Sequence, residues 1–331
     1  MPVTRDLDID ALRASIIRGD RRGLARGITL VESDLPQHQA QAEDLLTGLL
    51  PETGKAVRLG VSGAPGVGKS TFVEAFGMHV VETGRRVAVL AIDPSSHLSG
   101  GSILGDKTRM DELSRHPSAF VRPTPAGRML GGVARRTREA ILICEAAGFD
   151  VVIVETVGVG QSEATVASMV DVFLLLIAPG GGDELQGIKR GIVELVDLVV
   201  VNKSDGDLEA AAGRIAADYH AALGLLRSLS AHWQPEVLQC SALKRSGIGK
   251  VWQSVERCID SLREGGELDR RRALQLREWM SLEVTEGVLE SLRRDPEVAT
   301  LRKTLEGDVA AQRALPPVAA RQIHEAFFRR R

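Results

Sequence analysis

Residues 63–70 carry the pattern Gly-x-x-x-x-Gly-Lys-Ser, which constrains the local fold more than any other part of this sequence. Its glycines allow a tight turn that aims successive backbone N–H groups at one anion. Lys69 adds a positive charge for the β- and γ-phosphates, and the Ser70 hydroxyl is a ligand for Mg²⁺. The residues predicted to cradle the phosphates are Gly63, Ala64, Pro65, Gly66, Val67, Gly68, Lys69, Ser70 and Thr71.

The flanking residues favour a true P-loop over a chance match in a chain with 34 glycines. Val57–Val61 is an apolar, β-branched run that predicts a strand entering the loop. Residues 71–76 predict a helix leaving it, and the N-terminus of a helix attracts negative charge. The pattern therefore predicts a nucleotide-phosphate site at the end of a buried strand.

Short apolar runs alternate with helical stretches between residues 56 and 264, which predicts βαβ units and a mostly parallel sheet flanked by helices. The expected helices include 135–147 and 208–226. The expected strands are 57–61, 87–92, 151–155, 172–178, 198–202 and 236–240. In such α/β sheets ligands bind at the carboxyl ends of the strands, which is where the motifs of this chain fall.

The chain is predicted to have three parts. Residues 1–55 form an N-terminal helical extension with helices near 8–17 and 37–50, and residues 56–264 form the P-loop domain. Residues 265–331 form a helical C-terminal arm whose long helix covers about 269–293. The arm has little core of its own, so its apolar face is expected to pack on the main domain or on a second copy.

Composition excludes several other classes of protein. The formal net charge of −2 provides no basic surface for nucleic acid or an anionic membrane, and aromatic residues make up only 3%. The three cysteines, an odd number, are widely spaced and argue against a disulfide framework. No signal peptide or membrane-spanning run is recognised, so a cytoplasmic location is the expectation.

Guanine is the predicted base. Asn202, Lys203 and Asp205 fit the pattern Asn-Lys-x-Asp after a predicted strand, and the Asp205 carboxylate can accept from both the ring N–H and the exocyclic amine of guanine. Adenine lacks this pair of donors and would leave the carboxylate unpaired. Alone, an Asn-Lys pair at a strand end could be an ordinary turn. A second predicted loop, Ser241, Ala242 and Leu243, can bring backbone N–H groups to the guanine oxygen.

Glu155 ends the predicted strand 151–155, where nucleotide hydrolases place an acidic residue near Mg²⁺. Gly158 follows at the position expected beside the γ-phosphate. The usual acid is Asp, so the longer Glu suggests contact through water or a shifted metal position. The alternative is a solvent-facing Glu at a strand end.

Taken together, these motifs resemble the metallochaperone-like branch of P-loop GTPases. More closely, the chain resembles the methylmalonyl-CoA mutase-associated GTPase chaperones of the MeaB family, once labelled arginine/ornithine transport ATPases. The resemblance covers nearly the whole chain. It rests on residues 63–71, 93–96, 100–110, 155–160, 202–205 and 241–243, of which 93–96 and 100–110 are the most family-specific. It implies a homodimer that binds the adenosylcobalamin-dependent mutase, gates cofactor loading and protects the enzyme from inactivation.

Three further residues are assigned roles near the nucleotide. Asp93 closes a predicted strand and Asp106 lies in a Gly-rich loop, so both are candidate outer-sphere Mg²⁺ ligands or positioners of the attacking water. Asp93 could instead cap a helix before Pro94. The resemblance marks the loop 178–184 as a nucleotide-responsive switch, and Lys189 behind it is either a catalytic lysine or a solvated one.

Slow intrinsic hydrolysis is expected because Val159 stands where Ras-like enzymes place the water-orienting glutamine, and the sequence identifies no arginine finger in cis. Rival functions are a nickel-delivery GTPase, a small-molecule kinase or transport ATPase, and a GTP-dependent interaction module without meaningful hydrolysis. The scattered histidines and the absence of Cys-x-x-Cys disfavour nickel, and Asn202–Asp205 disfavours ATP.

Overall fold

A computed structural model describes residues 7–33, 35–93, 110–125, 130–156, 163–180, 190–225 and 230–329. The chain forms two compact units, Met1–Gln275 and Leu276–Arg331, and each is treated separately. The predicted boundaries at 55/56 and 264/265 stay predictions. No helix among the described residues combines the length and apolar character needed to cross a bilayer.

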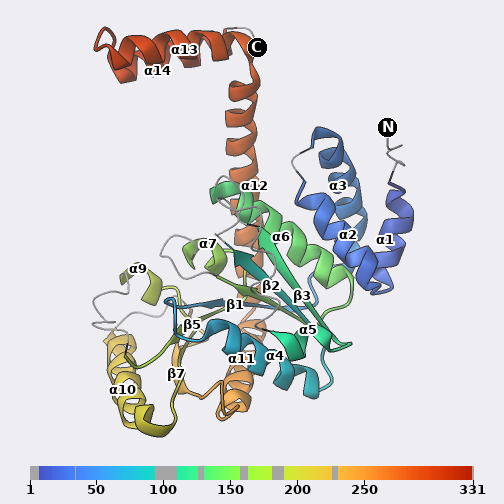
Figure 1. The fold of residues 1–331 in the computed structure, drawn as a ribbon, viewed down its shortest axis with the longest axis vertical. Coiled ribbons are helices and arrows are strands. Elements are labelled where there is room, and N and C mark those ends of the chain that lie inside the picture. The colour runs from blue at the N-terminus through green and yellow to red at the C-terminus, as the bar shows by residue number, and fades with distance from the viewer. Residues whose placement is uncertain are drawn as a thin grey trace. The chain divides into compact units, whose positions relative to one another are not determined.

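The first unit is built on one parallel sheet whose order in the described residues is β3-β2-β4-β1-β5-β6-β7. The P-loop strand β1 lies between β4 and β5 (Figure 1). The strands are β1 Val57–Ser62, β2 Val87–Asp93, β3 Ala119–Pro125, β4 Val151–Glu155, β5 Val172–Ile177, β6 Leu198–Val201 and β7 Glu236–Gln239. The predicted α/β P-loop fold with a helical C-terminus is confirmed.

Helices cover both faces of the sheet and create two hydrophobic cores. Leu59 and Leu174 pack with α4, α5 and α11 on one face, whereas Phe173 and Leu175 pack with α6, α7 and α10 on the other. The helices and short 3₁₀ turns that follow or join the strands are α4 Lys69–Glu82, α5 Asp111–Arg115, α6 Leu130–Ala146, α7 Glu163–Ala167, α9 Arg190–Val193, η3 Gly206–Leu208, α10 Glu209–Leu225 and α11 Ile248–Glu264.

Strand β3 was missed by the sequence prediction. It contains Pro123 and Pro125, and proline cannot donate to a ladder, so a strand with two prolines reads as a loop. The two prolines are tolerated because, among the described strands, β3 lies at the edge of the sheet and pairs with β2 alone.

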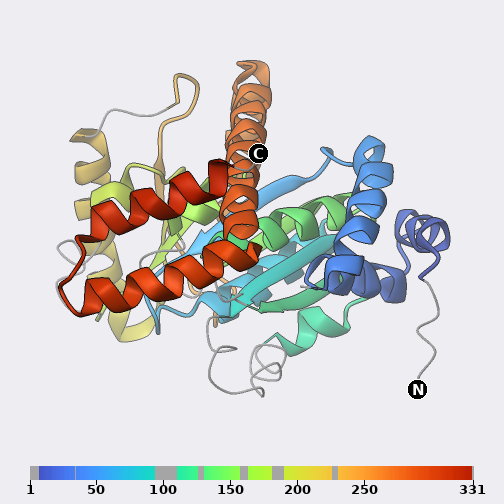
Figure 2. The ribbon, with the colours of Figure 1, turned by 90° about the horizontal axis from the view of Figure 1, so that it is seen from above.

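The N-terminal extension contains three helices rather than the two expected: α1 Ile9–Ile17, α2 Arg21–Val31 and α3 Pro36–Leu49, followed by the turn η1 Leu50–Glu52. They pack on one another and on α6. Figure 2 shows these three helices, in blue, beside the sheet. Helix α2 was missed because Gly23 and Gly27 lower its helix propensity. Both glycines allow close packing, since a Cβ at Gly23 would lie 2.3 Å from the Ser15 hydroxyl and one at Gly27 2.8 Å from Ile16 Cδ1.

Helix α12 (Glu267–Arg294) begins in the first unit and continues into the second, where α13 (Pro296–Ala310) and α14 (Pro316–Phe328) pack against each other. Both shorter helices begin with proline, whose missing N–H costs nothing at the first helical position.

Candidate functional site

The P-loop forms one wall of a pocket of about 530 Å³ at the carboxyl ends of β1, β2 and β4. Gly66 and Gly68 adopt φ values of 84° and 92°, in the left-handed region that favours glycine. No atom lies within 4 Å of a Cβ built on Gly66, so the loop leaves open space above its backbone. Ala64 and Pro65 are exposed at the mouth, and Val67 is buried beneath the loop.

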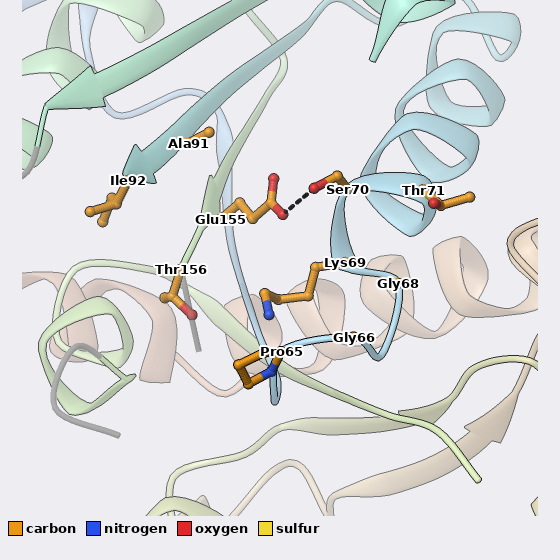
Figure 3. Close-up of a pocket in the computed structure, with 10 residues that line it drawn as sticks. All are labelled: Pro65, Gly66, Gly68, Lys69, Ser70, Thr71, Ala91, Ile92, Glu155 and Thr156. Atoms are coloured by element: carbon orange, nitrogen blue, oxygen red, sulfur yellow. Dashed lines mark hydrogen bonds between the residues drawn. The ribbon is translucent and has the colours of Figure 1, made fainter. Parts of the chain in front are cut away.

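Lys69 begins α4 and its side chain lies in the pocket (Figure 3). Its Nζ donates to the carbonyl oxygens of Gly63 (2.8 Å) and Ala64 (3.1 Å). Burial lowers the pKa of Lys69, while the carboxylates of Glu155 and Glu163 act in the opposite direction. The lysine is thus a partly desolvated cation held by two carbonyl groups. A phosphate anion can take the place of these two acceptors.

Two oxygen-bearing side chains meet where the start of α4 faces the end of β4. Glu155 ends β4 with 6% of its surface exposed, and its Oε1 accepts a hydrogen bond from the Ser70 hydroxyl at 3.1 Å (Figure 3). The buried position excludes the alternative of a solvent-facing Glu at a strand end. A carboxylate beside a hydroxyl is the hard oxygen pair that Mg²⁺ prefers.

Asn202 ties the loops that follow β6 and β7 to the P-loop. It follows β6, is 2% exposed, and its Nδ2 donates to Val67 O at 2.9 Å. Its Oδ1 accepts from Ala242 N at 3.0 Å and from the Cys240 thiol at 3.6 Å. Burial raises the pKa of Cys240 to about 12, which keeps the thiol protonated as a donor. One buried amide therefore sets the distance between three loops.

Lys203 adds a second connection between these loops. It has φ 57°, a left-handed conformation uncommon outside glycine, and its Nζ donates to Gly66 O at 2.8 Å. Asp205 lies beside the second loop, 3.4 Å from Lys244 Nζ. The strained backbone directs the Lys203 side chain over the P-loop.

The loop that follows β7 is closed by paired backbone bonds between Ser241 and Ser246. The Ser241 hydroxyl accepts from Lys244 N at 3.2 Å, and Ala242 N is taken by Asn202. Leu243 at the tip is 82% exposed. The next residue, Lys244, pairs with Asp205, so this exposed apolar side chain lies in the same loop as a contact to Asp205.

The structure brings together the P-loop, Glu155, Asn202–Asp205 and Ser241–Leu243 in one region. Asp93 is the last residue of β2, but its side chain is not described. Asp106, Gly158, Val159 and Lys189 lie outside the described residues, as do most of the loop 178–184 and all of 94–109. Among the residues that are described, no three His, Cys, Asp or Glu side chains gather as a metal cluster.

Three pocket residues were not predicted from the sequence: Ala91, Ile92 and Thr156. Ala91 and Ile92 are among the last three residues of β2, and Thr156 directly follows β4, so strand position is the signal that could have identified them.

Comparison with known proteins places the chain in a family. The family model described as "Methylmalonyl Co-A mutase-associated GTPase MeaB" matches residues 24–297. GTPase ArgK of Escherichia coli is 51% identical over 275 residues, covering 83% of each chain. The mitochondrial methylmalonic aciduria type A homolog of Mus musculus is 46% identical over 329 residues, covering 96% of this chain and 79% of that one.

A solved structure agrees over the full length. The crystal structure of an LAO/AO transport system kinase superposes with a TM-score of 0.77 at 39% identity and covers 98% of both chains. The P-loop, the loops that Asn202 joins to it and these matches lead to one conclusion: the chain belongs to the MeaB family of methylmalonyl-CoA mutase-associated GTPases and is itself a GTPase.

Proposed function

We propose that this GTPase uses its nucleotide cycle to control an adenosylcobalamin-dependent methylmalonyl-CoA mutase, gating cofactor loading and protecting the mutase from inactivation. The observation that carries the proposal is the Asn202 junction, which joins the guanine loops to the P-loop in a chain whose family is named for that mutase. A junction of this kind lets occupancy of the base subsite bear directly on the loop that holds the phosphates.

We assign the guanine contacts as follows. The Asp205 carboxylate accepts from the base and gives up its ion pair with Lys244 in doing so. The amides of Ala242 and Lys244 are engaged within the protein, so we assign the Leu243 amide to the guanine oxygen. The side chains of Lys203 and Leu243 cover the faces of the base, and the backbone amides of residues 63–71 hold the phosphates.

The pocket fits a magnesium ion because Ser70 and Glu155 already place two oxygen donors side by side, 3.1 Å apart. We propose that Ser70 and Glu155 hold Mg²⁺, with Asp93 and Asp106 as further acidic groups. When bound, the ion neutralises charge on the β- and γ-phosphates. Lys69 holds charge on the transferring phosphoryl group, water is the nucleophile, and Lys189 stays a proposal from the sequence alone.

Basal hydrolysis by the purified protein is expected to be slow and to rise at least about tenfold when the mutase is added, because partner completion is how incomplete GTPase sites are accelerated. Phosphate release under saturating GTP measures the effect. The matched control is Lys69→Ala with the mutase present, which should show no stimulated rate. A wild-type rate that does not change with mutase, in the presence or absence of adenosylcobalamin, would contradict the client assignment.

We also propose a homodimer that forms through the C-terminal helices. Within the second unit Leu276, Met280 and Val284 recur every four residues on α12 and are 54%, 63% and 61% exposed. Residues spaced by four lie on one helix face, and an apolar face so exposed favours a partner.

Light scattering tests this assignment. The wild-type protein should have the mass of two copies. The double variant Met280→Glu, Val284→Glu should have the mass of one copy. The Glu278→Gln change, at an exposed residue on the same helix, should leave the dimer intact. A dimer that persists in the double variant would place the interface elsewhere.

A further inference from the structure

A buried pair of hydroxyl groups joins the ends of the two strands that carry the site. Ser62 is the last residue of β1 and is 0% exposed, and Thr156 directly follows β4 and is 1% exposed. Thr156 Oγ1 donates to Ser62 Oγ at 2.8 Å. The Thr156 amide also donates to Val61 O at 3.0 Å, so side chain and backbone together extend the β1–β4 contact past the last ladder pair.

Each partner is one residue away from a group in the proposed chemistry. Ser62 precedes Gly63, whose carbonyl accepts from Lys69 Nζ. Thr156 follows Glu155, whose carboxylate accepts from Ser70. Thr156 itself lines the pocket, as Figure 3 shows. The pair therefore connects the stretch of chain that contacts Lys69 to the stretch that ends in Glu155.

The other side of the P-loop base is fixed by close packing. A Cβ built on Gly63 would lie 2.2 Å from Leu176 O, so the backbone at this point is already pressed against β5. The hydroxyl pair fixes the same stretch of chain against β4. Since threonine is stiff at χ1, its hydroxyl has little freedom to choose another partner. The base of the P-loop is thus held between two neighbouring strands.

We propose that Thr156 is a positioning residue for GTP hydrolysis: through Ser62, its hydroxyl holds the Glu155 end of β4 at a set distance from Lys69 and the P-loop. The proposal rests on the proposed roles of Lys69 and Glu155. The proposal does not depend on the identity of the client, because it is tested by the basal rate of GTP hydrolysis.

Thr156→Val tests the proposal because valine keeps the shape and removes only the hydroxyl. A reacting group displaced by about 1 Å can cost roughly 100-fold in rate, so a partial displacement should lower basal kcat about tenfold. GDP affinity and KM should stay within about twofold, because the phosphate-binding amides are untouched. Thr156→Ser, which keeps the hydroxyl, should retain at least about half of the wild-type kcat.

Ser62→Ala completes the experiment. It should reproduce the loss in kcat, and the double variant should lose no more than either single variant, because the two hydroxyls act as one unit. Wild-type kcat in Thr156→Val would overturn the proposal. So would equal losses in kcat and GDP affinity with a lowered Tm in both Thr156→Val and Thr156→Ser, since that pattern marks a merely structural threonine. If the mutase fails to stimulate the wild type, the client assignment is wrong. The results for Thr156 and Ser62 still stand, because they are measured without the mutase.

Discussion

Replacing Lys69 by alanine is expected to lower kcat for GTP hydrolysis about 1,000-fold, the effect of losing one preorganised electrostatic group, or about 4 kcal/mol. Nucleotide binding should weaken less, because the backbone amides of the loop remain. Single-turnover phosphate release measures the first quantity, and titration with a fluorescent GDP analogue measures the second. A variant that keeps more than about one-tenth of the wild-type rate would contradict the role of Lys69.

The same variant should not unfold more easily than the wild type without nucleotide. Burial places the folded-state pKa of Lys69 below its ordinary value, so the charged form is disfavoured in the folded protein. The charge therefore costs stability at every pH below the folded pKa, and the cost fades only as pH rises through that value. Alanine removes the cost at neutral pH, so Tm should be unchanged or higher. Lys250→Ala, an exposed lysine on α11, is the matched control and should change neither rate nor Tm.

The parallel sheet could be predicted because its strands are buried on both faces and read as apolar runs. Runs such as 172–178 needed no knowledge of tertiary contacts. Strand β3 and helix α2 could not, because their prolines and glycines oppose local propensity and are tolerated only through packing. In both places a tertiary contact decides the structure, and a local pattern cannot report that contact.

The candidate site likewise has a part that the sequence could predict and a part that it could not. Its motifs were visible because Gly63–Ser70, Asn202–Asp205 and Ser241–Leu243 are contiguous in sequence. What the sequence could not indicate is how they are joined. The Asn202 bonds to Val67 and Ala242 span separations of 135 and 40 residues, and Thr156 meets Ser62 across 94.

The start of α12 makes a further long-range connection, at the amino ends of the strands, whereas the pocket lies at their carboxyl ends. Asp171 precedes β5, has a fully buried side chain, and its Oδ2 accepts from Arg58 N at 2.8 Å. Arg272 donates to both oxygens of Asp171, at 2.8 and 2.6 Å, and to the carbonyls of Gly54 and Ala56. The neighbouring Arg271 pairs with Asp197 before β6 at 3.2 Å. Two adjacent arginines thus hold the starts of the central strands.

Arg272→Ala is expected to lower the free energy of unfolding by about 3–5 kcal/mol, because it leaves the buried Asp171 carboxylate without its cation. The loss is large since water cannot readily replace the guanidinium at a side chain with 0% exposure. Chemical denaturation of the full chain measures this loss as a shift of the unfolding midpoint, with the slope of the transition unchanged.

Arg270→Ala on the same turn is the matched control. Arg270 is exposed, and within the described part of the chain it donates to the carbonyls of Gly265 and Gly266 alone, so its loss should cost no more than about 1 kcal/mol. Asp171→Asn should fall between the two, because the amide oxygen can still accept from the Arg58 amide while the charge is gone. Equal midpoints for the Arg272 and Arg270 variants would mean that the first turns of α12 are not held by charge. The start of α12 would then be held through the burial of Leu268 and Gln275 instead.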